Sequence, residues 1–106
     1  MPKYLVRASL SADGLKGTLK EGGTARRDAV AKLVGSVGGT LEAFYYAFGE
    51  DDIYTILDMP DNVSAATVSV TVAAAGAGRP VTLVLITPEE MDLVAQKHAE
   101  YRAPGA

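Results

Sequence analysis

The order in which short apolar runs and helical stretches follow one another is the feature that most limits the fold of this chain. Residues 4–9 form a short, mostly apolar run typical of a strand, and residues 81–86 form another. Between them, the runs 40–48 and 53–58 flank the connection Gly-Glu-Asp at 49–51, whose three residues suit a hairpin. The sequence therefore predicts four strands, of which the middle two are adjacent along the chain.

Two helices are expected between these strands. Apolar residues recur at helical spacing from Val30 to Val37, after a possible cap at Thr24 and before the two glycines at 38–39. A second helix is expected from Asp61 to near residue 76, because alanines surround its centre. That centre alone alternates with a period of two and is also compatible with a strand.

The segments outside this pattern are expected to be a loop and a last helix. Residues 11–23 contain four glycines, so we expect a loop with at most a helical turn or two. Residues 87–90, Thr-Pro-Glu-Glu, provide an N-cap, a proline at the first helical position and a glutamate at the third. A helix is expected from there to about Tyr101.

This order predicts the α+β class and a ferredoxin-like, split βαβ arrangement (βαββαβ). The sheet would have four antiparallel strands, with two helices on one face and an added C-terminal helix. A length of 106 residues is typical of one domain, which we expect to span residues 1–106.

Composition removes several classes of function. The absence of cysteine excludes disulfides, thiolate nucleophiles, thiolate-bound zinc and cysteine-held iron–sulfur clusters. Ten basic and thirteen acidic residues leave no positive excess to hold a phosphate backbone, so no nucleic acid partner is expected. His98, the one histidine, is expected on the inner stripe of the last helix, and a single histidine rarely makes a metal site. No metal and no cofactor are expected.

The chain shows no membrane or export signal. No apolar run approaches the roughly 20 residues that span a bilayer. The first ten residues are too short and too polar for the apolar region of a signal peptide, since Arg7 interrupts them. We therefore expect a cytoplasmic protein.

The second hairpin predicts which side chains lie on the sheet face that the helices leave open. Pairing about the connection at 49–51 places six alternate residues on one face: Phe44, Tyr46, Phe48, Asp52, Tyr54 and Ile56. The opposite face would carry the residues that suit helix packing: Ala43, Tyr45, Ala47, Ile53, Thr55 and Leu57. The large aromatic residues of the first set are thus expected on the uncovered face.

An aromatic patch of several hundred Å² represents several kcal/mol of unused burial at ~25 cal/mol per Å². We expect it to be covered by the same face of a second copy or by the C-terminal helix. Two sheets face to face would form a closed barrel, with Tyr46, Tyr54 and Asp52 at the edge of a cavity. The alternative is that the aromatic side chains pack the interface and enclose nothing. A homodimer or higher homo-oligomer is expected in either case.

Five segments carry a resemblance to a known family: SADGLKG at 11–17, Arg-Arg at 26–27, LEAFYY at 41–46, FGEDDI at 48–53 and TPEEM at 87–91. With these segments the chain resembles the GYD-domain proteins, a largely bacterial and archaeal family, from Tyr4 to about Val94. The resemblance implies a ferredoxin-like fold, and relatives of this fold often pair as dimeric α+β barrels. Gly49 and Asp52 match the family's turn, but Asp51 stands where the family has an aromatic residue, so a ligand role of that aromatic does not carry over.

Six residues are candidates for binding a ligand: Arg7, Lys16, Arg26, Tyr46, Asp52 and Tyr54. The lysine in Gly-Leu-Lys-Gly-Thr at 14–18 precedes the last glycine, which is the wrong order for a phosphate loop. The resemblance implies that Lys16 and Arg26 lie near a common edge of the sheet. Asp52 is expected to pair with Arg7, and its acidic neighbours are expected to be solvated turn charges.

These observations lead to three functional hypotheses. The first is a homodimeric α+β barrel that serves as a small-molecule-binding or accessory domain. The second is a cofactor-independent enzyme of oxygenase or isomerase type in the cavity between the sheets, which rests on fold analogy alone. The third is a structural interaction module with a filled barrel. The sequence identifies no catalytic residue and no ligand.

Overall fold

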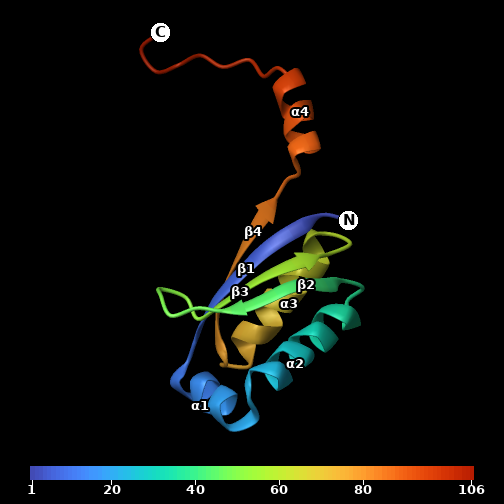
Figure 1. Cartoon of the computed structure of the whole chain (residues 1–106). Helices are drawn as coiled ribbons and strands as arrows, with labels where there is room; N and C mark the ends of the chain where they lie inside the picture. The colour runs from blue at the N-terminus through green and yellow to red at the C-terminus, as the bar shows by residue number, and fades with distance from the viewer.

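The computed structural model describes residues 1–106 and contains one four-stranded antiparallel sheet and four helices (Figure 1). The strands are β1 (Lys3–Leu10), β2 (Thr40–Tyr46), β3 (Ile53–Asp58) and β4 (Gly78–Leu85), arranged in the order β2-β3-β1-β4. The helices are α1 (Ala12–Glu21), α2 (Gly23–Ser36), α3 (Asn62–Ala74) and α4 (Pro88–Gln96). Because α2 and α3 lie on one face of this sheet, the predicted ferredoxin-like arrangement is confirmed.

The core lies between the sheet and the two covering helices. On β3, the side chains of Ile53, Thr55 and Leu57 are buried, while the alternate side chains are only partly buried. Seven buried residues pack together as the core: Tyr4, Val6, Val34, Leu57, Met59, Ala65 and Val68. The two helices contribute only Val34, Ala65 and Val68 to this cluster, so the covered face is closed by few large side chains.

The pairing between β2 and β3 differs by one residue from the prediction. Tyr45 pairs with Tyr54 and Phe44 with Thr55, because the pair Ala47–Asp52 closes a loop of four residues rather than three. A shift of one residue moves every side chain of a strand to the other face. The prediction was therefore right for β3 and wrong for β2.

Phe44 and Tyr46 consequently face the helices, and Tyr45 lies on the open face instead. Beyond these pairs, a β-bulge between Leu41 and Ala43 contains Glu42 as an extra residue. The bulge restores the alternation toward the start of the strand, so that Leu41 again packs against the core.

Helix α1 occupies the glycine-rich segment that was expected to be a loop. The Ser11 hydroxyl caps it by accepting a hydrogen bond from the Gly14 N–H at 3.0 Å. A Cβ at Gly14 would overlap the carbonyl oxygen of Ala77, so the glycine lets α1 approach the connection between α3 and β4. The prediction of a loop was wrong because this long-range contact outweighs the low helix propensity of glycine.

Helices α3 and α4 begin at the caps that the sequence predicts, but α4 is shorter than expected. Asp61 caps α3 by accepting a hydrogen bond from the Ser64 N–H at 2.8 Å, which confirms a helix rather than a strand there. Thr87 and Glu90 form the predicted capping box of α4. This helix ends at Gln96, so His98 lies beyond it and not on its inner stripe.

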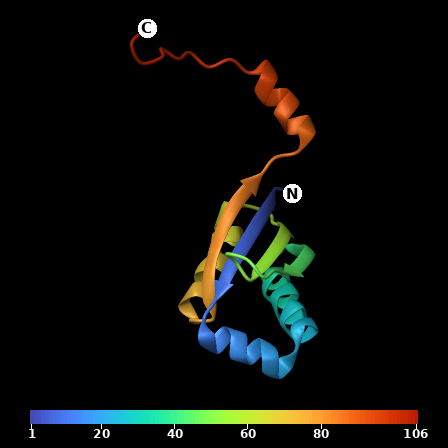
Figure 2. The ribbon, with the colours of Figure 1, turned by 60° about the vertical axis from the view of Figure 1, so that its left-hand side comes forward.

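Helix α4 projects away from the rest of the molecule (Figures 1 and 2). The molecule measures 57 Å along its longest axis but 33 Å along the next. The radius of gyration is 16.8 Å, against about 13 Å for a compact domain of 100 residues. Met91, Leu93 and Val94 are exposed on α4, which leaves the open sheet face of its own chain uncovered. None of the helices combines the length and the apolar character needed to cross a membrane.

A pair of glycine substitutions tests the packing where α2 leads into β2. A Cβ at Gly39 would lie 2.9 Å from both the Asp58 carbonyl oxygen and Val34 Cγ1, whereas nothing lies within 4 Å of one at Gly35. Gly39→Ala is expected to lower the free energy of unfolding by about 1–3 kcal/mol through overpacking. Gly35→Ala is expected to raise it by roughly 0.5–1 kcal/mol, because alanine favours the helix. Urea unfolding of both variants measures the difference; equal effects would contradict the packing described.

Candidate functional site

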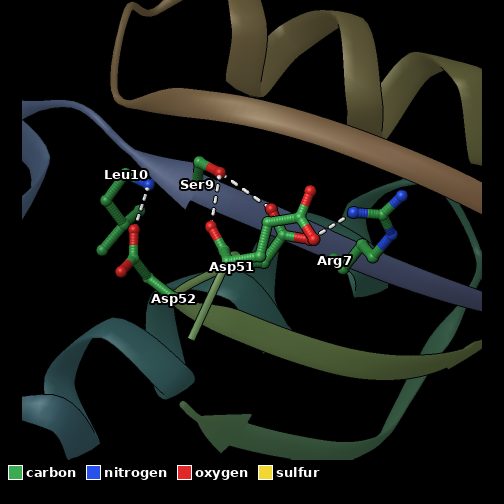
Figure 3. Close-up of polar contacts among 6 residues, drawn as sticks. Arg7, Ser9, Leu10, Asp51 and Asp52 are labelled. Carbon is green, nitrogen blue, oxygen red and sulfur yellow. Dashed lines mark hydrogen bonds and ion pairs between the residues drawn. The ribbon is translucent and has the colours of Figure 1, made fainter. Parts of the chain in front are cut away.

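Carboxylates tie the loop between β2 and β3 to strand β1 (Figure 3). Asp51, whose side chain is almost fully buried, forms an ion pair with Arg7 and accepts a hydrogen bond from the Ser9 hydroxyl at 2.7 Å. Asp52 accepts a hydrogen bond from the backbone N–H of Leu10 at 2.8 Å. Arg7 therefore pairs with Asp51 and not, as expected, with Asp52. Asp51 is also not the solvated turn charge that the sequence suggested.

The ion pair keeps both of its members charged. The Arg7 guanidinium, followed by the Ser9 hydroxyl, holds the pKa of the Asp51 carboxyl below its ordinary value of 3.8. Asp51 in turn raises the pKa of Arg7. A carboxylate stabilised in its ionised form is a weak proton acceptor, because a general base needs a pKa near the working pH. This cluster is thus suited to fixing the loop rather than to catalysis.

The open face of the sheet is mainly apolar. Tyr45 is 70% exposed there, and Val81 and Leu83 on β4 are also exposed. Tyr54, on the same face, lies directly opposite Arg7 on the neighbouring strand. The face therefore combines unpartnered apolar area with an arginine that already has its counter-charge.

The covered face contains a cavity of about 70 Å³ between α2 and α3. The cavity forms because α2 packs mainly against β2, whereas α3 packs mainly against β4. Apolar side chains line it from three sides: Val6, Ala8, Phe44 and Ile53 from the sheet, Val30 and Leu33 from α2, and Val68 and Val72 from α3. Apolar enclosure with a few polar groups is typical of small-molecule sites.

The hydroxyl groups at this cavity are already bonded to neighbouring residues. Thr55 donates to the Val6 carbonyl oxygen at 2.9 Å, and Ser69 shares a hydrogen bond of 2.6 Å with Thr82. Arg26, in the second turn of α2, also lines the cavity. It forms no ion pair and is therefore the polar group there that is free to meet a ligand.

Tyr46 positions the beginning of α2 beside this cavity. Its hydroxyl donates a hydrogen bond of 3.1 Å to the carbonyl oxygen of Gly23, and its ring lies where a Cβ of Gly23 would be. Burial raises the pKa of the Tyr46 hydroxyl above its ordinary value of 10.0, while the positive charge of Arg26 acts in the opposite direction. Tyr46 and Arg26 are thus close neighbours at one end of the covered face.

The structure divides the six candidate ligand residues among separate places. Arg26 and Tyr46 lie together at the covered face, and Arg7 and Tyr54 lie together on the open face. Asp52 anchors the loop, and Lys16 is exposed on α1 and does not line the depression that α1 shares with Arg26. No group of three or more histidine, cysteine, aspartate or glutamate side chains converges as a possible metal site.

The apolar lining of the cavity was not foreseen as a site. Helical spacing identified Val30 and Leu33 as inward-facing, and Phe44 was assigned to the opposite face of the sheet. The helical spacing of Val30 and Leu33 shows that they point toward the sheet. It does not show whether α2 and α3 are far enough apart to leave a cavity between them. Arg26 is the one residue whose sequence position could have indicated this site, because it is a charged residue at the start of a helix whose other inward-facing residues are apolar.

The Arg7–Asp51 pair predicts a pH-dependent contribution to stability. Because the pKa of Asp51 is lowered on folding, its stabilisation is present above about the ordinary value of 3.8 and is lost as the pH falls through the lower folded value. Asp51→Asn is therefore expected to unfold more easily than the wild type at pH 7, with the difference shrinking below pH 4. Thermal unfolding across this range measures the effect. Asp28→Asn, which breaks an exposed ion pair with Arg27, serves as the control and should show little change at either pH.

The chain was compared with protein-family models, curated proteins and solved structures. Neither the curated proteins nor the solved structures include a match to the chain. The family model described as the GYD domain matches residues 4–95, which cover the four strands except Lys3 and helix α4 except Gln96. The chain belongs to the GYD domain family.

Proposed function

We propose that this chain is a binding domain for a small, mainly apolar molecule. The observation that carries the proposal is the cavity between α2 and α3. Protein interiors are normally packed as densely as organic crystals, so a space lined by apolar side chains on three sides is unusual. The space of about 70 Å³ leaves apolar side chains without contacts on one side, and an apolar ligand would supply those contacts.

The size and lining of the cavity favour a slender ligand. An engineered apolar cavity of about 150 Å³ holds benzene, so this smaller space suits a short aliphatic chain better than a fused ring system. The Thr55 and Ser69 hydroxyls are engaged within the protein and unavailable as nucleophiles. This arrangement supports binding in preference to catalysis.

Hexan-1-ol provides a direct test, because it is apolar along its length and uncharged. We expect it to shift the methyl NMR resonances of Val30 and Val68 in a saturable way. Val72→Phe, which fills the cavity from α3, should abolish the shifts. Val63→Phe, at a position 76% exposed on the same helix, should leave them unchanged. Absence of binding to the wild type, or equal binding to both variants, would contradict the proposal.

A second proposal concerns assembly: we infer that two copies pair through their open sheet faces. Tyr45, Val81 and Leu83 expose apolar area there that nothing in the chain covers. The arrangement would be a homodimeric α+β barrel.

The charges of the open face favour a second copy of this chain as the occupant. Lys3 pairs with Glu42 and Asp58, and Arg7 pairs with Asp51. These two cations are thus neutralised within each protomer, and Arg79 near the start of β4 is the one cation of this face without an ion pair. Two copies of the face can therefore meet with limited repulsion between like charges. Helix α4 follows β4 at the edge of this face and carries further exposed apolar residues beyond its own sheet.

Sedimentation equilibrium tests this assembly. Tyr45→Asp places a charge on the exposed apolar part of the open face, on the edge strand β2, and should weaken dimerisation at least tenfold. Phe48→Asp makes the same change at a fully exposed position in the β2–β3 loop and should leave the dimer intact. A monomeric wild type at micromolar concentration, or equal masses for both variants, would refute the open face as the interface.

A further inference from the structure

Arg26 differs from the other partly buried basic residues in having no counter-charge. Of the ten lysines and arginines, three are partly buried: Lys3, Arg7 and Arg26. Lys3 and Arg7 each form an ion pair with a carboxylate, whereas no carboxylate lies within 4.0 Å of Arg26. A partly buried charge without a partner is unfavourable, so such a group points to an anion that binds there.

The position of Arg26 relates this charge to the cavity. Its side chain lines the apolar cavity and also a neighbouring depression beside α1. Arg26 thus lies at the boundary between the apolar interior and a more polar surface. An arginine at such a boundary can bind the charged end of a molecule whose apolar end is enclosed.

We propose that the ligand is a small monocarboxylate, with its carboxylate on Arg26 and its aliphatic chain in the cavity between α2 and α3. This inference rests on the proposed binding function and assigns the chemical class of the ligand. The planar guanidinium matches a carboxylate through two parallel N–H···O hydrogen bonds. The cavity contributes apolar contacts that do not depend on charge.

The acidic residues near Arg26 favour a single negative charge on the ligand. Asp13 and Glu21 line the depression on the other side of Arg26, beyond ion-pair distance from its guanidinium. Their charges would repel a phosphate or a dicarboxylate more strongly than a monocarboxylate.

Three probes with the same six-carbon chain and different head-group charges are compared at pH 7: hexanoate, hexan-1-ol and hexylamine. Differences in their affinity report the contribution of the head-group charge, because the apolar contacts are similar. In NMR titrations of the full chain, we expect hexanoate to bind at least tenfold more tightly than hexan-1-ol. Arg26→Leu should remove this advantage, so that hexanoate binds the variant no more tightly than hexan-1-ol does. Arg26→Lys keeps the charge without the planar fork, so it should retain part of the advantage.

Arg27 provides a matched control, because it is the next residue of α2 and is exposed beside Asp28. Arg27→Leu removes the same charge and should preserve the preference for hexanoate. Equal binding of hexanoate and hexan-1-ol to the wild type would overturn the assignment of a carboxylate while leaving the proposed function intact. Tightest binding of hexylamine would also overturn it, since Asp13 and Glu21 would then dominate. If none of the three probes binds, the proposed function fails, and this inference fails with it.

Discussion

The attachment of the β2–β3 loop to β1 is the interaction on which the two faces of the sheet depend. Asp51 is held by Arg7 and Ser9, and Asp52 by the backbone of Leu10, so the loop has one position relative to the central strand. With Asp52 held at β1, its carbonyl oxygen accepts from the Ala47 N–H, and this pair sets the loop of four residues that aligns β2 with β3. Because side chains alternate along a strand, the pairing decides which aromatic residues reach the interior and which remain on the open face.

The two faces of the sheet differ in whether their basic side chains are paired with carboxylates. On the open face, the cations of β1 are neutralised by neighbouring carboxylates, and the remaining surface is largely apolar. On the covered face, Arg26 stands without a partner at the end of an apolar cavity. Tyr45 and Tyr46 illustrate the division, since two adjacent residues of one strand belong to these opposite faces. Association with a second copy and binding of a ligand are therefore proposed for different sides of one sheet.

Features that depend on local sequence were predictable, whereas features that depend on distant contacts were not. The caps at Asp61 and Thr87, the order of the elements and the alternation of β3 follow from neighbouring residues, and the structure confirms them. Helix α1 depends on a contact of Gly14 with Ala77 in the connection between α3 and β4, and no local helix propensity contains such a contact. The pairing of β2 depends on one residue of loop length. The cavity depends on the separation of two helices, and periodicity within each helix carries no information about that separation.

The β-bulge at Glu42 decides what the deletion of a single codon does to strand β2. Leu41 and Ala43 pair with the consecutive residues Leu57 and Ile56, so Glu42 has no pairing position of its own. Loss of its codon would leave a regular strand in which all the remaining side chains keep their faces. Loss of one codon in the loop at 48–51 would instead exchange the two faces of β2. The same change in gene length thus preserves the faces of β2 at one end of the strand, where it removes only the carboxylate that pairs with Lys3, and exchanges them at the other.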